Sequence, residues 1–130
     1  MENIAHLQPV SKLNLWTGRV LSGLTSAFLL LDCAMKLAQA RVAIEGTARV
    51  GYSPGVVLPL GVVELASVLL YLFPRTAPLG AGLLTAYLGG AVATHVRLGE
   101  PFWMPIVFGV VIWLGLYLRD PRVRALLAAK

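Results

Sequence analysis

Residues 56–96 read VVLPLGVVELASVLLYLFPRTAPLGAGLLTAYLGGAVATHV, two apolar segments joined by a turn that contains two prolines. The segments cover about residues 56–73 and 79–96, close to the roughly 17–25 residues that a helix needs to cross the hydrocarbon core of a bilayer. Pro74 and Pro78 in the turn interrupt any continuous helix. A connection this short predicts two antiparallel membrane-spanning helices.

Two further apolar segments, at about residues 15–37 and 103–119, flank this hairpin. Backbone polar groups in lipid must be paired within the chain, so four such segments indicate four helices. The composition agrees, since 58% of the residues are hydrophobic and only 13% are charged, whereas soluble domains carry about 25% charged residues. The sequence therefore predicts an all-α integral membrane four-helix bundle that forms a single domain over residues 1–130.

The connections differ in length. Residues 97–101 form a short turn, whereas residues 38–55 form the only long loop and are expected to hold a short interfacial helix that Gly51 and Pro54 end. The C-terminal LRDPRVRALLAAK, residues 118–130, is typical of a short basic helix lying near anionic lipid.

The first apolar segment has some features of a secretory signal, because AQA at Ala38–Ala40 resembles a cleavage site. Asp32 and Lys36 interrupt the segment before that site, and three further apolar spans follow it. We therefore expect the segment to be retained as the first helix.

Basic residues are distributed unequally between the two sides of the predicted bundle. With four spans both termini share a side, and that side would hold seven basic residues: Lys12, Arg19, Arg75, Arg119, Arg122, Arg124 and Lys130. The other side would hold four: Lys36, Arg41, Arg49 and Arg97. The positive-inside rule then predicts a multi-pass protein of the inner membrane with N- and C-termini in the cytoplasm. Basic residues scattered over loops do not indicate nucleic-acid binding.

Ionisable and polar residues interrupt three of the four apolar segments. Asp32 and Lys36 are four residues apart and share a helix face, and Glu64 lies near the middle of the second segment. An ionisable side chain at the bilayer centre costs about 2.5–3.5 kcal/mol, so these groups are expected to face the bundle interior. Counting along the helices places them at similar depth in the outer half, where we expect a ligand pocket lined by Asp32, Lys36, Glu64, Tyr87, Thr94 and His95.

Within this pocket Glu64, His95 and Asp32 are the candidates for acid–base catalysis. Two alternatives remain open. In the first, Asp32 and Lys36 form a mutually neutralising pair at the membrane edge, with Lys36 extended towards water. In the second, His95 lies at the membrane interface and has no further role.

Small residues recur at four-residue spacing along the third apolar segment, and such a stripe is expected to let another helix approach closely. These residues are Gly82, Ala86, Gly90 and Thr94.

The residue inventory excludes several chemistries. Cys33 is the only cysteine, so the chain has no internal disulfide and no C-x-x-C redox pair. One histidine in the apolar segments excludes haem held by paired histidines, and the sequence has no zinc, phosphate-loop or serine-triad motif. We expect no metal and no covalent cofactor.

Four stretches, taken in order, carry a resemblance to a known family. They are GRVLSGLTSAFLLLDCAMKL at 18–37, ARVGY at 48–52, GVVEL at 61–65 and TAYLGGAVATHVR at 85–97. From about Trp16 to Arg124 the chain resembles the DoxX-like membrane proteins. The resemblance implies a four-helix protein of the bacterial inner membrane. The wider family takes its name from a small subunit of an archaeal thiosulfate–quinone oxidoreductase, and other members are linked to redox complexes, although this chain has no soluble redox domain.

The residues and the resemblance together predict a protein that binds a small, mostly apolar molecule, such as a quinone or a lipid, in an outward-facing polar pocket. The expected partners are the lipid bilayer, the small molecule, and a protein partner in a redox complex or a second copy of the chain. Three alternatives stay open. They are a membrane isomerase or cyclase acting on a lipid, a proton-coupled exporter of the small multidrug resistance kind, and a non-catalytic accessory subunit. Those exporters carry their key glutamate in the first helix, whereas Glu64 lies in the second.

Overall fold

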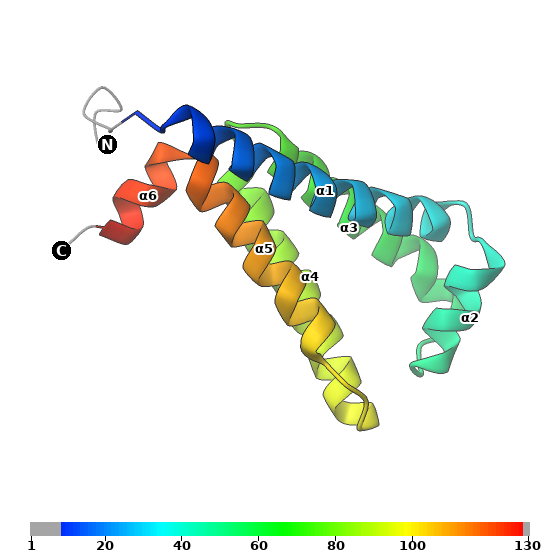
Figure 1. Cartoon of the computed structure of the whole chain (residues 1–130). Coiled ribbons are helices and arrows are strands. Elements are labelled where there is room, and N and C mark those ends of the chain that lie inside the picture. Colours follow the sequence, from blue (N-terminus) through cyan, green and yellow to red (C-terminus); the bar gives the residue numbers. More distant parts are fainter. Residues whose placement is uncertain (1–8, 129–130) are drawn as a thin grey trace.

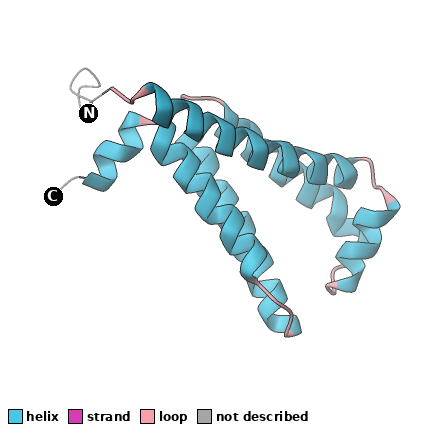
Figure 2. Cartoon of the chain, in the orientation of Figure 1, coloured by secondary structure: helices cyan, strands magenta, loops and turns pink. Residues whose placement is uncertain are grey.

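The computed structural model describes residues 9–128, and within them the chain forms helices and loops without strands (Figure 2). The prediction of an all-α protein is confirmed. The elements in chain order are α1 (Lys12–Leu37), α2 (Arg41–Arg49), the 3₁₀ turn η2 (Pro54–Val56), α3 (Val57–Leu72), α4 (Ala77–Leu98), α5 (Trp103–Arg119) and α6 (Pro121–Ala128). The short helix expected in the long loop is α2, and the expected C-terminal basic helix is α6.

Local sequence signals set several helix ends. Ser11 caps the start of α1, where its hydroxyl oxygen accepts a hydrogen bond of 3.3 Å from the backbone N–H of Asn14. Pro78 lies in the first turn of α4, where its missing N–H would have had no helical partner. Gly99 ends α4 with a φ of 70°, which a residue without a Cβ adopts at little cost.

The four long helices α1, α3, α4 and α5 form a ring in which each packs against two neighbours. In Figure 1, α1 and α3 lie side by side in one arm, α4 and α5 form a second arm, and the two arms diverge like a V. The arms meet near the beginning of α1 and α6, here called the narrow end. They separate towards α2, here called the wide end.

Close backbone contacts hold the narrow end together. A Cβ built on Gly80 of α4 would lie 2.2 Å from the backbone nitrogen of Tyr71 in α3. A Cβ on Gly18 of α1 would lie 2.7 Å from the carbonyl oxygen of Gly115 in α5. Only glycine allows these approaches, which is the way small residues bring membrane helices together.

The predicted stripe of Gly82, Ala86, Gly90 and Thr94 does not make such contacts, so the expectation of a close helix interface there is wrong. A Cβ on Gly82 or Gly90 meets nothing within 4 Å, and both glycines are exposed. The prediction failed because α4 packs against α3 and the core with a neighbouring face. That face carries Gly80, Ala81 and Leu84. Ala86, Gly90 and Thr94 instead line the cavity described below.

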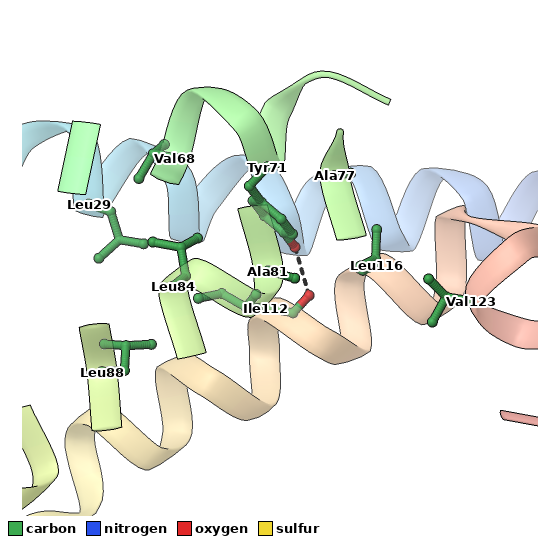
Figure 3. Close-up of a cluster of buried hydrophobic side chains, with 10 residues drawn as sticks. All are labelled: Leu29, Val68, Tyr71, Ala77, Ala81, Leu84, Leu88, Ile112, Leu116 and Val123. Atoms are coloured by element: carbon green, nitrogen blue, oxygen red, sulfur yellow. Dashed lines mark hydrogen bonds between the residues drawn. The ribbon is translucent and has the colours of Figure 1, made fainter. Parts of the chain in front are cut away.

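The apolar core lies at and next to the narrow end (Figure 3). Tyr71 stands at its centre, is fully buried and donates a hydrogen bond of 2.7 Å to the carbonyl oxygen of Ile112. Its hydroxyl oxygen accepts a bond of 2.9 Å from Ser22 in α1. The other core side chains are Leu29, Val68, Ala77, Ala81, Leu84, Leu88, Ile112, Leu116 and Val123.

Three helical segments are long and apolar enough to cross a membrane: α1, η2 together with α3, and α4. The fourth candidate is the pair of α5 and α6, which bends by 102° at Asp120. Many large apolar side chains on the outer faces are exposed, among them Leu24, Val63, Leu79 and Val110. Such faces are expected of helices surrounded by lipid rather than by water.

Candidate functional site

A cavity of about 570 Å³ lies at the wide end. Its walls come from α1, α2, α3 and α4. Most of the lining side chains are small or apolar, and a polar group lies on one side. The lining residues are Asp32, Met35, Lys36, Val42, Ala43, Gly46, Thr47, Val50, Tyr52, Leu60, Ala86, Tyr87, Gly90, Ala91, Thr94 and His95.

Lys36 is the centre of the polar side of this cavity. Its Nζ atom lies 2.5 Å from Oδ2 of Asp32 and 2.8 Å from Oε2 of Glu64. It also lies 2.6 Å from the hydroxyl oxygen of Tyr87, and that hydroxyl donates a bond of 3.2 Å to Oε2 of Glu64. Three helices therefore bring together four of the residues that the sequence predicts for the pocket.

The two carboxylates have different surroundings. The side chain of Asp32 is 38% exposed and lines the cavity, whereas that of Glu64 is fully buried behind Lys36 and is not part of the wall. Oε1 of Glu64 has no hydrogen-bond partner among the residues that the structure describes. A molecule in the cavity would therefore reach Asp32 directly and Glu64 only through Lys36 or Tyr87.

The hydrogen bonds of the cluster leave no donor free. The ammonium of Lys36 has three protons, and these go to Asp32, Glu64 and Tyr87. The single proton of the Tyr87 hydroxyl goes to Glu64. Oδ1 of Asp32, in contrast, accepts no hydrogen bond from the described residues, so this residue of the cavity wall keeps a free acceptor.

His95 and Thr94 lie on another part of the cavity wall and do not bond to the Lys36 cluster. Nδ1 of His95 lies 2.7 Å from the carbonyl oxygen of Ala91, which only accepts, so Nδ1 carries a proton. Nε2 of a neutral ring is then an acceptor. The hydroxyl of Thr94 donates to the carbonyl oxygen of Gly90, and it accepts a bond of 2.8 Å from Tyr52.

The part played by α2 was missing from the sequence prediction. This helix and the loop after it supply six residues to the cavity wall: Val42, Ala43, Gly46, Thr47, Val50 and Tyr52. The alternation of small and apolar residues in RVAIEGTARV could have indicated a helix with one face packed over the pocket. The expected pocket was built from the spanning segments alone.

Polar contacts join α2 and its loop to α4 across the wide end. Arg49 forms an ion pair of 3.2 Å with Glu100, just beyond the end of α4. Arg97 of α4 donates a bond of 3.0 Å to the carbonyl oxygen of Val50. With the bond between Tyr52 and Thr94, these contacts bridge the two arms at the end where they are furthest apart (Figure 1).

The polar cluster offers no arrangement for a metal ion. In the part of the chain that the structure describes, no three His, Cys, Asp or Glu side chains lie close enough together to hold one. Cys33 is buried and donates its thiol proton to the carbonyl oxygen of Leu30 at 3.2 Å, as a packing residue does.

A family model for the DoxX-like family matches residues 20–115, which is most of the chain. The match includes Asp32, Lys36, Glu64, Tyr87, Thr94 and His95. The protein belongs to the DoxX-like family, and its apolar helices are those of a multi-pass membrane protein. Neither a search of curated proteins nor a search of solved structures finds a match to the chain.

Proposed function

We propose that the protein crosses the bacterial inner membrane four times with both termini in the cytoplasm, and binds a small, mostly apolar molecule in the cavity at its wide end. The head of this molecule donates hydrogen bonds. The reduced form of a quinone, a hydroquinone with two phenolic hydroxyls, is the compound class that fits this description. A lipid with a hydroxyl head is the second class. The cavity then opens on the outer half of the membrane.

The cavity walls support an apolar ligand. Small-molecule sites are concave and mostly apolar, with a few polar groups that fix the orientation of the ligand. Here Met35, Val42 and Leu60 are among the apolar wall residues, while Asp32 and His95 supply polar atoms. A volume of about 570 Å³ is within the usual range for such sites.

The free acceptors are the observation that carries the proposal. Every polar proton of the Lys36 and Tyr87 side chains is already donated inside the cluster. Two acceptor atoms of the cavity wall, Oδ1 of Asp32 and Nε2 of a neutral His95, accept no hydrogen bond from the described residues. A ligand hydroxyl can donate to either atom. The carbonyl oxygen of an oxidised quinone finds no free donor on these side chains, and an unsatisfied polar group in such a site costs affinity.

The proposal is tested by comparing the two oxidation states of one ligand. We would titrate the purified full-length protein in detergent, under anaerobic conditions, with decylubiquinol and with decylubiquinone, and measure binding by calorimetry. The reduced form should bind at least tenfold more tightly.

His95→Phe should weaken decylubiquinol binding about five- to tenfold, the usual effect of one hydrogen bond, and should leave decylubiquinone unaffected. Thr85→Ala is the matched control, because Thr85 lies on α4 outside the cavity and bonds to Trp113. Equal affinity for the two oxidation states would overturn the assignment of a donor head. Saturable binding of neither compound, together with no other small molecule in mass spectra of the purified protein, would overturn the pocket itself.

A further inference from the structure

A second cavity, of about 380 Å³, lies at the narrow end, at the opposite end of the molecule from the ligand cavity. It is formed where the start of α1, the turn between α3 and α4, and the junction of α5 and α6 meet. Four arginines line it, with a single acidic residue: Arg19, Arg75, Arg119, Arg122 and Asp120.

Asp120 is already paired with one of these arginines. Its Oδ2 lies 2.8 Å from a terminal guanidinium nitrogen of Arg122, and its Oδ1 accepts bonds of 2.9 Å and 3.1 Å from the backbone N–H and Nε of the same residue. Burial raises the pKa of Asp120, but the bonds from Arg122 outweigh it and hold the pKa below its ordinary value. Asp120 therefore neutralises Arg122 and no other arginine of the cavity.

Arg122 also builds the frame of the cavity. Its guanidinium donates to the carbonyl oxygen of Pro74 in the turn between α3 and α4, which ties that turn to the start of α6. Asp120 is only 7% exposed, whereas the side chain of Arg122 is 40% exposed and its bond to Pro74 lies at the surface. The wall of the cavity is thus fixed by contacts within the fold.

Arg119 is held in place by neutral groups only. Its Nε donates a bond of 3.1 Å to the hydroxyl of Ser22, and a terminal nitrogen donates a bond of 2.9 Å to the carbonyl oxygen of Tyr71. The guanidinium lies over the ring of Tyr71, 4.8 Å from its centre. These contacts orient the group, and no carboxylate among residues 9–128 neutralises its charge.

In the described part of the chain the two remaining arginines have no acidic partner either. Arg19 is stacked over the ring of Trp16 at 5.3 Å, and Arg75 lies in the turn after α3. Among residues 9–128 neither of them forms an ion pair. One wall of the same cavity is apolar, since Leu15 lines it.

We propose that the narrow-end cavity binds a phosphate group, which Arg19, Arg75 and Arg119 contact together. Among residues 9–128 no carboxylate pairs with these three guanidinium groups, which leaves a strong positive potential in a confined space, and planar guanidinium groups match phosphate oxygens in pairs. The headgroup of an anionic phospholipid and free phosphate share this chemistry. The apolar wall at Leu15 favours the lipid, whose glycerol region would continue along α1. The proposal does not depend on the function of the wide-end cavity.

The test is native mass spectrometry of the full chain in detergent, titrated with palmitoyl-oleoyl phosphatidylglycerol or the matching phosphatidylcholine. The anionic lipid should bind at least tenfold more tightly than the zwitterionic one. The double variant Arg19→Gln, Arg75→Gln should lose at least tenfold of that affinity. Both side chains are exposed and hold no other element in place, so the variant should fold. Arg124→Gln, which removes one charge from the same end outside the cavity, should change the affinity less than twofold.

Competition with inorganic phosphate at millimolar concentration distinguishes the two sources of the phosphate group, the lipid headgroup and the free anion. No displacement of the phosphatidylglycerol would support a lipid headgroup, whereas displacement, with phosphate binding that is lost in the double variant, would support a site for the free anion. A loss of binding free energy in the double variant that is no more than twice the loss in Arg124→Gln would overturn the proposal, because two removed charges against one would then account for it by net charge alone. Binding of neither phosphatidylglycerol nor inorganic phosphate would overturn it as well.

Discussion

At the scale of single residues, Lys36 is shared between two carboxylates. One ammonium cannot neutralise both Asp32 and Glu64, and only Asp32 has solvent access. Glu64 is fully buried, and one of its oxygens meets no hydrogen-bond donor within residues 9–128. An unpaired charge in such a place is expensive, so the stability of the wide end depends on Lys36 remaining charged and in contact.

Lys36→Met should therefore lower the free energy of unfolding by about 3–5 kcal/mol, the usual cost of leaving a buried charge without its partner. Adding Glu64→Gln should recover much of that loss, because it removes the charge that was left unpaired. Unfolding by SDS titration in mixed micelles would measure both. Lys12→Met is the control, since Lys12 is exposed at the start of α1. The shared-cation arrangement is wrong if Lys36→Met and Lys12→Met unfold alike.

The residues of the Lys36 cluster could be predicted from the sequence for a simple physical reason. Ionisable groups are rare in apolar helices and must find partners, and the rise of a helix gives their depth. Depth along the helix alone could not show that His95 is apart from the Lys36 cluster. His95 lies at the same end of the molecule but on another part of the cavity wall. The contacts among Arg119, Ser22 and Tyr71 were not predicted, because neutral hydroxyls and a terminal arginine are common at helix ends.

At the scale of helices, the position of each glycine decides what it does. Spacing of small residues along α4 predicted an interface, but spacing is the same on every face of a helix and does not say which face meets a neighbour. The glycine that α3 contacts is Gly80, which lies outside the predicted stripe. The lengths of the spanning helices were predicted well, because they depend on composition rather than on the direction of a face.

Gly80→Ala should destabilise the protein by about 1–3 kcal/mol, since the new methyl group overlaps the backbone of Tyr71 and forces α3 and α4 apart. Gly90→Ala should be neutral or slightly stabilising, because the space around Gly90 is open and alanine favours a helix. Thermal unfolding of the two variants side by side measures the difference. A Gly90→Ala protein that melts lower than Gly80→Ala would contradict the helix packing described above.

At the scale of the whole molecule, the two ends differ in charge. The narrow end gathers arginines around one cavity, whereas the wide end pairs Arg41 with Glu45 and Arg49 with Glu100. Positive charge without acidic partners is typical of the cytoplasmic side of membrane proteins. The same asymmetry supports the proposed orientation and the proposed phosphate site.

Alkaline phosphatase, which is active only in the periplasm, should be inactive when it is fused after Lys130 and active when it is inserted in the loop at Ser53. The reason is that the narrow end, with its excess of arginines, is expected to stay in the cytoplasm. Green fluorescent protein at the same two positions is the control and should give the opposite pattern. Activity after Lys130 would reverse the orientation and place the ligand cavity on the cytoplasmic side.

The V shape also has a mechanical consequence. The arms touch at the narrow end through close backbone contacts at glycines, and the side chains of Tyr71 and Arg119 bridge them there. With its 22 residues, α4 is a lever about 33 Å long, so a turn of about 5° at the joint moves its far end by about 3 Å. The contacts of Arg49 and Arg97 at the far end would resist such a turn at the point of greatest leverage. Together with the bond between Tyr52 and Thr94, these contacts would limit how widely the arms open.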